Sequence, residues 1–138
     1  MNSKEEKLRK QIIAIGKIRK NSELLITTNN EVEVCNGKGS NLRSPDCPNC
    51  GSWKHHWERL TRKQWPQICS NSKCANLATD GGHVVFADNR KGRKYIIPLC
   101  SSCNGKSPDE KYTIDVGTVM ISANCSETCD KMKLEEDE

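Results

Sequence analysis

Two cysteine pairs on either side of an alternating apolar segment constrain the fold of this chain more than any other feature. Cys69 and Cys74 are separated by four residues, and Cys100 and Cys103 by two. A short loop between two cysteines directs both sulfur atoms to one point, and four thiolates supplied in this way satisfy the tetrahedral coordination of a structural Zn²⁺ ion. The spacing therefore predicts a first zinc site with these four ligands, which staples a β-hairpin.

The segment between the pairs has the pattern of two strands and a turn. Side chains alternate from His83 to Ala87, and Tyr95 to Leu99 is nearly all apolar. The intervening turn carries four basic residues, Arg90, Lys91, Arg93 and Lys94. Cations at a hairpin tip are placed to contact phosphates, but they are also how a loop stays in solvent. The turn is therefore a candidate nucleic-acid contact or a solvated loop.

The composition indicates why the fold needs a staple. Of the 138 residues only 34% are hydrophobic and 4% aromatic, so the core is small. Nine cysteines supply either disulfides or metal ligands, and the cellular compartment decides between them. The charged N-terminus lacks the apolar run of a signal peptide, and no stretch reaches membrane-spanning length. We therefore expect an intracellular protein, in the cytoplasm or with the nucleic acid of a nucleus or nucleoid, that binds zinc and no membrane.

The net charge of +4 is unevenly distributed along the chain. Residues 1–20 carry +5 and residues 127–138 carry −4, which leaves +3 for the middle. A basic head and body attract polyanions, although solvated ends also keep a small domain in solution. We predict three regions: a basic amphipathic helix over 1–20, a zinc-binding domain over 21–126 and a flexible acidic tail over 127–138.

The N-terminal helix is predicted from apolar residues at three- and four-residue steps. Leu8, Ile12 and Ile15 lie on one stripe, and Gly16 weakens the helix without breaking it. Such a stripe packs on the domain or on a protein partner. The alternative is an arm that contacts nucleic acid.

Two further strand regions are predicted from β-prone runs. Leu24–Thr27 and Val32–Cys35 flank a turn-forming Thr-Asn-Asn-Glu stretch, which predicts a hairpin. Residues 113–121 predict one additional strand.

A second metal site is predicted at Cys47 and Cys50, which are spaced C-x2-C and followed by a glycine. A helix after them would place Trp53, His56, Trp57 and Leu60 on one face, so that His56 points inward and His55 outward. The pair needs two more ligands. The candidates are His56, His83, Cys35, Cys125 and Cys129, and we favour His56 with His83, because neutral imidazole is a usual companion of a cysteine pair.

The arrangement from Cys69 to Asn104 resembles the zinc-stapled group of HNH endonucleases, a treble-clef or ββα-metal fold that includes phage Holliday-junction resolvases. The resemblance rests on C-x4-C, then Gly82-His83-Val84-Val85, then Ile97-Pro98-Leu99-Cys-x2-Cys-Asn104. It implies that the zinc is structural, that His83 is the general base and that Asn104 helps to hold a catalytic Mg²⁺.

One departure from the family matters for activity. Active members have an acidic Mg²⁺ ligand directly before the histidine, and this chain has Gly82 there. A hard cation prefers oxygen ligands, so Asn104 alone would hold it poorly unless Asp80 substitutes. Without a catalytic role, His83 is available to the second zinc site.

The sequence thus predicts an α+β protein with a small zinc-stapled treble-clef core, short added hairpins and an N-terminal amphipathic helix. Three functions follow from it. The first is a two-zinc HNH-like module that binds nucleic acid and has weak or lost phosphodiesterase activity. The second is an active Mg²⁺-dependent endonuclease, and the third is a zinc-stapled structural or interaction protein.

Overall fold

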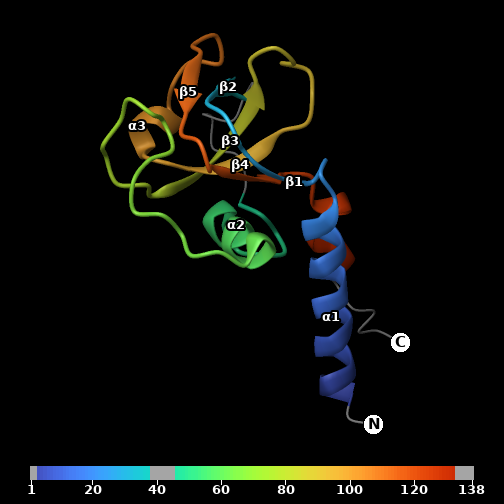
Figure 1. The fold of residues 1–138 in the computed structure, drawn as a ribbon. Helices are drawn as coiled ribbons and strands as arrows, with labels where there is room; N and C mark the ends of the chain where they lie inside the picture. The colour runs from blue at the N-terminus through green and yellow to red at the C-terminus, as the bar shows by residue number, and fades with distance from the viewer. Residues whose placement is uncertain (1–2, 38–45, 133–138) are drawn as a thin grey trace.

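The computed structural model describes residues 3–37 and 46–132, which form a six-stranded antiparallel sheet with helices packed against it (Figure 1). The strand order is β1-β6-β4-β3-β2-β5. The elements in chain order are α1 (Ser3–Lys20), β1 (Leu25–Thr27), β2 (Val32–Asn36), α2 (Trp53–Thr61), β3 (Asp80–Phe86), β4 (Tyr95–Leu99), α3 (Ser101–Asn104), β5 (Tyr112–Ile114), β6 (Val119–Ser122) and the 3-10 turns η1 (Cys125–Glu127) and η2 (Cys129–Met132). The predicted mixture of helix and sheet is confirmed.

Each face of the sheet has its own apolar core. Successive side chains of a strand point to opposite faces, and in β4 this places Ile96 in one core and Ile97 in the other. The first core joins the sheet to α1, α2 and η2 through residues such as Ile18, Trp57 and Met132. The second core lies against the segments that carry Cys69, Cys74, Cys100 and Cys103. A chain poor in apolar residues therefore builds two small cores, each with its own cysteines.

The β3–β4 hairpin at the centre of the sheet confirms the strands predicted between the cysteine pairs. Asp80 pairs with Leu99 and His83 with Ile96, in antiparallel register. All five residues of β4 are buried, which explains its uninterrupted apolar sequence.

The hairpin predicted between residues 24–27 and 32–35 is wrong. β1 pairs with β6, whereas β2 pairs with β3 and β5, so the two strands are not neighbours. The Thr-Asn-Asn-Glu stretch is instead a crossing between distant strands. The backbone of Thr28 bonds to Thr118, near the start of β6.

The single strand predicted over residues 113–121 is also wrong, because the chain turns in the middle of it. β5 ends at Ile114 and β6 begins at Val119, and the two strands lie at different places in the sheet. Gly117 has φ +88°, a left-handed conformation that glycine adopts without strain. The turn at Gly117 therefore interrupts the β-prone run and divides it into two strands.

Helix α1 is confirmed over Ser3–Lys20, and only its C-terminal part joins the core. Ile15 and Ile18 are buried, whereas Leu8, Ile12 and Ile13 are more than half exposed. Figure 1 shows the first turns of α1 extending away from the rest of the molecule. The apolar stripe is therefore used by the domain at one end of the helix and exposed at the other.

The predicted boundary of the acidic tail at residue 127 is too early. Cys129 and Met132 are buried in the core beside α1, because η2 packs on that helix. The domain continues at least to Met132, and residues 133–138 lie outside the described part of the chain.

No helix within residues 3–37 and 46–132 is long and apolar enough to cross a membrane.

Candidate metal centres

The first candidate metal centre consists of Cys69, Cys74, Cys100 and Cys103, as predicted. Their Sγ atoms all lie within 4.8 Å of one another. The Sγ atoms of Cys74 and Cys100 are 3.7 Å apart. A tetrahedral ion with Zn–S bonds of about 2.3 Å requires sulfurs roughly 3.8 Å apart, so this separation fits zinc.

Local structure positions these four sulfurs. The first pair lies on a loop, in which the Cys74 amide donates to the Asn71 carbonyl and the Cys69 amide to the Asn76 carbonyl. The second pair follows β4, where Cys100 is the N-cap of α3 and accepts from the amide of Cys103 at 3.4 Å. The β3–β4 hairpin holds the loop and the helical turn on one side of the sheet.

Side-chain amides donate to the sulfurs of this centre. Asn71 Nδ2 donates to Cys103 Sγ at 3.3 Å, and Asn76 Nδ2 to Cys100 Sγ at 3.8 Å. Burial alone would raise the pKa of Cys100, but the hydrogen bonds from Cys103 and Asn76 outweigh it and lower that pKa to about 7. N–H donors that favour a thiolate are what a cysteine ligand requires. The spacing pattern did not indicate these asparagines, although Asn71 lies within C-x4-C and Asn76 lies two residues after it.

Asn36 anchors the second pair from the other side. Its buried Nδ2 donates to the carbonyls of Cys103, Asn104 and Lys106, and Tyr112 donates to its Oδ1 at 2.6 Å. This side chain fixes the turn after β4 to β2. Nothing in the local sequence indicated the role.

The second candidate metal centre consists of Cys47, Cys50, His56 and Cys129, whose donor atoms also lie within 4.8 Å of one another. Cys47 Sγ is 3.5 Å from Cys129 Sγ, and Cys50 Sγ is 3.8 Å from His56 Nδ1. Helix α2 supplies His56 and η2 supplies Cys129, so this centre joins three segments of the first core.

The hydrogen bonding of His56 suits a metal ligand. Its Nε2 is 2.9 Å from the Ser122 carbonyl, which only accepts, so Nε2 carries the proton. Nδ1 is then left with its lone pair directed toward Cys50. A ligating histidine commonly donates its other N–H to a carbonyl in this way.

The second centre also has donors to its sulfurs. Asn49 Nδ2 donates to Cys129 Sγ at 3.3 Å and Arg59 to Cys50 Sγ at 3.6 Å. The pKa of Cys129 is lowered, mainly by a hydrogen bond from Cys50 and also by His56 and Asn49. In each centre one thiol has a lowered pKa, whereas burial raises the pKa of Cys69 and Cys103 in the first centre, and the hydrogen bond with Cys129 and burial raise that of Cys50 in the second. The number and type of donors fit Zn²⁺, which would cross-link the segments and perform no redox chemistry.

Cys129 takes the place that we predicted for His83, which is a correction. His83 is not in the group, and its ring instead packs edge-on against Trp53 with centroids 4.7 Å apart. Burial, with help from Lys94 and His56, lowers the pKa of His83 to about 4.

Cys125 lies close to the second centre without completing it. Its Sγ is 3.7 Å from that of Cys47, but it is not one of the four mutually close donors. Cys35, the remaining candidate, is buried in β2 opposite Val85 and belongs to neither group. All nine cysteines fall in the described ranges, and each is a free thiol.

The residues predicted for catalysis lie on opposite sides of β3. A Cβ on Gly81 would come 2.6 Å from the backbone of Trp53, so this side of the strand, which also carries His83, faces α2. A Cβ on Gly82 would come 2.9 Å from Asn104 Oδ1. The structure therefore does not bring His83 and Asn104 into one cleft.

Asp80 contacts Asn104 on the Gly82 side of the strand. Asn104 Nδ2 donates to Asp80 Oδ2 at 3.1 Å. This carboxylate is two residues earlier on the same face, as the alternation of a strand requires. The Asp80 carboxylate therefore accepts a hydrogen bond from the Asn104 amide.

The basic hairpin tip is partly neutralised by acids of the same chain. Arg93 pairs with Glu127 and, at 3.5 Å, with Glu23, and Arg90 pairs with Asp109 at 3.8 Å. Lys91 is exposed. The methylene groups of Lys94 pass beside Gly37. Arg93 thus ties the β3–β4 loop to η1.

Comparison of the chain with protein-family models, with curated proteins and with solved structures gives no match.

Proposed function

We propose that this chain is a two-zinc, HNH-like treble-clef module that binds nucleic acid and cleaves it slowly or not at all. The observation that carries the proposal is the first metal centre. A cysteine loop, the β3–β4 hairpin and a helical turn follow one another in the treble-clef order, and the four sulfurs converge. The nucleic-acid part is supported by the net charge of +4.

Weak cleavage is proposed because the catalytic constituents are incomplete. Hydrolysis of a phosphodiester needs a divalent ion to carry developing charge and a base to accept a proton from water. The carboxylate expected beside Asn104 is replaced by Gly82, and His83 points to the other side of the strand. Four thiolates would leave the zinc of the first centre no open position for catalysis.

Metal analysis and nucleic-acid binding test the proposal together. We expect about two zinc ions per chain by mass spectrometry of the native protein, and loss of folded structure when a strong chelator removes them. Binding of duplex DNA or single-stranded RNA should weaken steeply with salt. One zinc or none per chain, or no binding of either nucleic acid at 50 mM salt, would contradict it.

An active endonuclease is the second candidate, favoured only by the contact between Asp80 and Asn104. This contact places a carboxylate where an oxygen ligand for Mg²⁺ is needed. Plasmid and branched DNA should be incubated with Mg²⁺ or Mn²⁺ and the native protein, with Asp80→Asn and His83→Ala as controls. Cleavage that both substitutions abolish would establish this function, and intact DNA at high protein concentration would exclude it.

A structural or interaction protein is the third candidate, and the exposed residues Leu8 and Ile12 favour it. Here α1 would dock on a partner protein. Leu8→Gln with Ile12→Gln should then alter the size of the native assembly by gel filtration and leave the zinc content at two.

A further inference from the structure

The positive charge of the chain is concentrated in α1 and in residues 53–63, which comprise α2 and its C-terminal cap. Helix α1 has seven basic residues and two acids, a net charge of +5. Residues 53–63 have four basic residues and one acid, a net charge of +3. Because the whole chain carries +4, everything else together carries −4. The two helices are therefore the basic part of an otherwise acidic molecule.

Most of these cations are not engaged within the domain; among residues 53–63, Arg59 donates to Asn49 and Cys50, and Lys54 lies over the ring of Trp65. Apart from Lys4, no basic residue of α1 or of residues 53–63 forms an ion pair with another described residue. The unused charges of α1 are exposed. The charges of α1 are therefore available to a ligand, whereas Arg90 and Arg93 of the β3–β4 tip are paired with acids of the chain.

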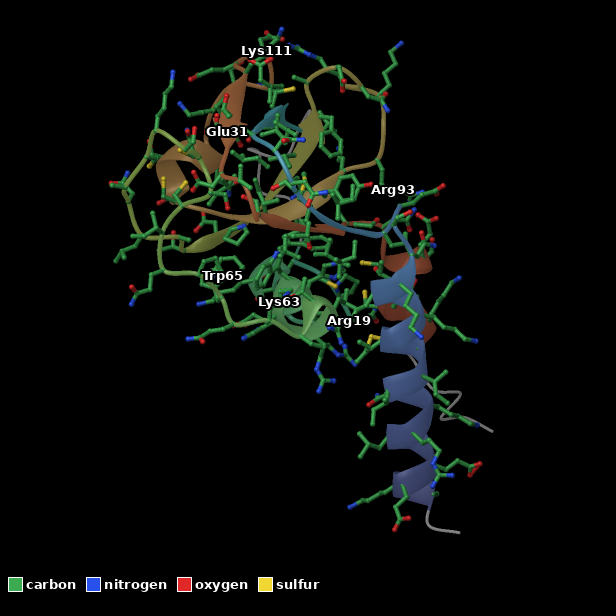
Figure 2. The ribbon with its side chains drawn as sticks, viewed as in Figure 1. Arg19, Glu31, Lys63, Trp65, Arg93 and Lys111 are labelled. Carbon is green, nitrogen blue, oxygen red and sulfur yellow. The ribbon has the colours of Figure 1, made fainter. Side chains whose placement is uncertain are left out.

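The two helices lie beside one another. Ile15 and Ile18 of α1 share a core with Trp57 and Leu60 of α2. Figure 2 shows Arg19 on the side of α1 nearest α2, with Lys63 just beyond the C-cap of α2, Arg62. The burial of one side of α2 in the sheet leaves its other side, which includes His55, outside.

We infer that nucleic acid binds across the exposed sides of α1 and residues 53–63, here called the helical basic surface, rather than at the β3–β4 tip. This inference rests on the proposed nucleic-acid function and names the part of the molecule that performs it. An 18-residue helix is about 27 Å long, and duplex DNA carries one phosphate charge per ~1.7 Å of axis. A long surface with one sign of charge and few acids matches such a regular polyanion.

The test compares two variants that each remove three positive charges. The helical variant is Arg19→Gln, Lys20→Gln, Lys63→Gln, and the matched control is Arg90→Gln, Lys91→Gln, Lys111→Gln. All six residues are exposed and none is a candidate metal ligand. Both variants should keep two zinc ions and the native melting temperature, which shows that they fold.

Binding is measured by fluorescence anisotropy with a 25-base-pair DNA duplex, a single-stranded RNA and poly-glutamate, over a range of salt. We expect the helical variant to bind nucleic acid about tenfold more weakly or worse and to lose about 2–3 from the slope of log K against log salt, at ~0.9 per phosphate contact. The control should change the affinity by less than about threefold, because its three residues lie outside the helical basic surface and make no phosphate contacts there.

Each other outcome has a definite meaning. Loss of binding in the control alone, or equal loss in both variants, overturns the helical basic surface and leaves the proposed function standing. Absence of nucleic-acid binding by the native protein contradicts the proposed function, and the inference falls with it. Binding of poly-glutamate as tightly as nucleic acid, with the same loss in the helical variant, overturns the inference in favour of an acidic protein partner.

Discussion

The two candidate metal centres differ in how far apart along the chain their donors lie. The first takes two close pairs that flank one hairpin, Cys69 with Cys74 and Cys100 with Cys103. The second takes one close pair, a histidine from the following helix, and Cys129, which is 82 residues from Cys47. Local spacing builds the first centre, whereas the second exists only once the whole first core has assembled.

The largest predicted effect is the loss of a ligand at the first centre. Structural zinc contributes roughly 10–16 kcal/mol of apparent binding free energy, which is as large as the whole stability of a typical domain. We expect Cys100→Ser to abolish the cooperative unfolding transition in circular dichroism and to lower the zinc content to less than one ion per chain, because the second centre forms only in the folded core.

Cys35→Ala is the matched control for this change, because Cys35 is equally buried and lies outside both centres. It should keep two zinc ions and a cooperative transition. A Cys100→Ser protein that still holds two zinc ions would contradict the assignment of Cys100 as a ligand of the first centre.

A smaller effect is predicted at the second centre, where Cys129→Ser should release one zinc ion and leave the first centre and its hairpin folded. We expect a loss of about 3–5 kcal/mol, because loss of a metal is one of the few mechanisms by which a single substitution causes so large an effect, with increased exposure of Trp57 in fluorescence. Cys125→Ser should retain both ions. If Cys125→Ser releases zinc and Cys129→Ser does not, the fourth ligand is Cys125 and the identity of this centre changes.

The contrast between these centres also explains what could be predicted from the sequence. The four ligands of the first centre, the β3–β4 hairpin, α1 and the inward face of α2 follow from periodicity and spacing over a few residues. Cys129 could be named as a candidate but not chosen over His83, because only the fold of η2 against α1 brings it near Cys47. The same limit applies to β1, whose partner β6 lies about ninety residues away.

Glycines 81 and 82 provide a third prediction, which concerns the strand between the two centres. A Cβ at Gly81 would press on the backbone of Trp53, and one at Gly82 on Leu99 and Asn104. We expect Gly81→Ala and Gly82→Ala each to lower the free energy of unfolding by about 1–3 kcal/mol through overpacking. Gly16→Ala in α1 is the control, since nothing lies within 4 Å of its added Cβ. It should stabilise the protein by ~1 kcal/mol. Equal effects at all three positions, measured by urea unfolding, would show that β3 is not closely packed on both sides.

The smallest effect is expected at His83, which lies near the second centre without belonging to it. Its pKa of about 4 in the folded protein is below the ordinary histidine value of 6.5, so the unfolded chain binds more protons between these values. Stability should therefore fall as the pH decreases below about 6.5, and His83→Gln should reduce this slope while the zinc content stays at two. A nuclear magnetic resonance titration that finds the folded pKa near 6.5 would contradict the burial of the His83 ring. A His83→Gln variant that loses zinc would return His83 to the list of ligands.

The fold joins the two ends of the described chain. α1 and β1 come first in the sequence, yet β1 pairs only with β6, and α1 packs on η2 (Figure 1). During synthesis on the ribosome, β1 must therefore wait for β6, and α1 must wait for η2, although α2, the other neighbour of α1, emerges earlier. The hairpin with its two cysteine pairs is complete by residue 103 and does not have to wait. Vectorial synthesis thus favours closing one side of the sheet before the other.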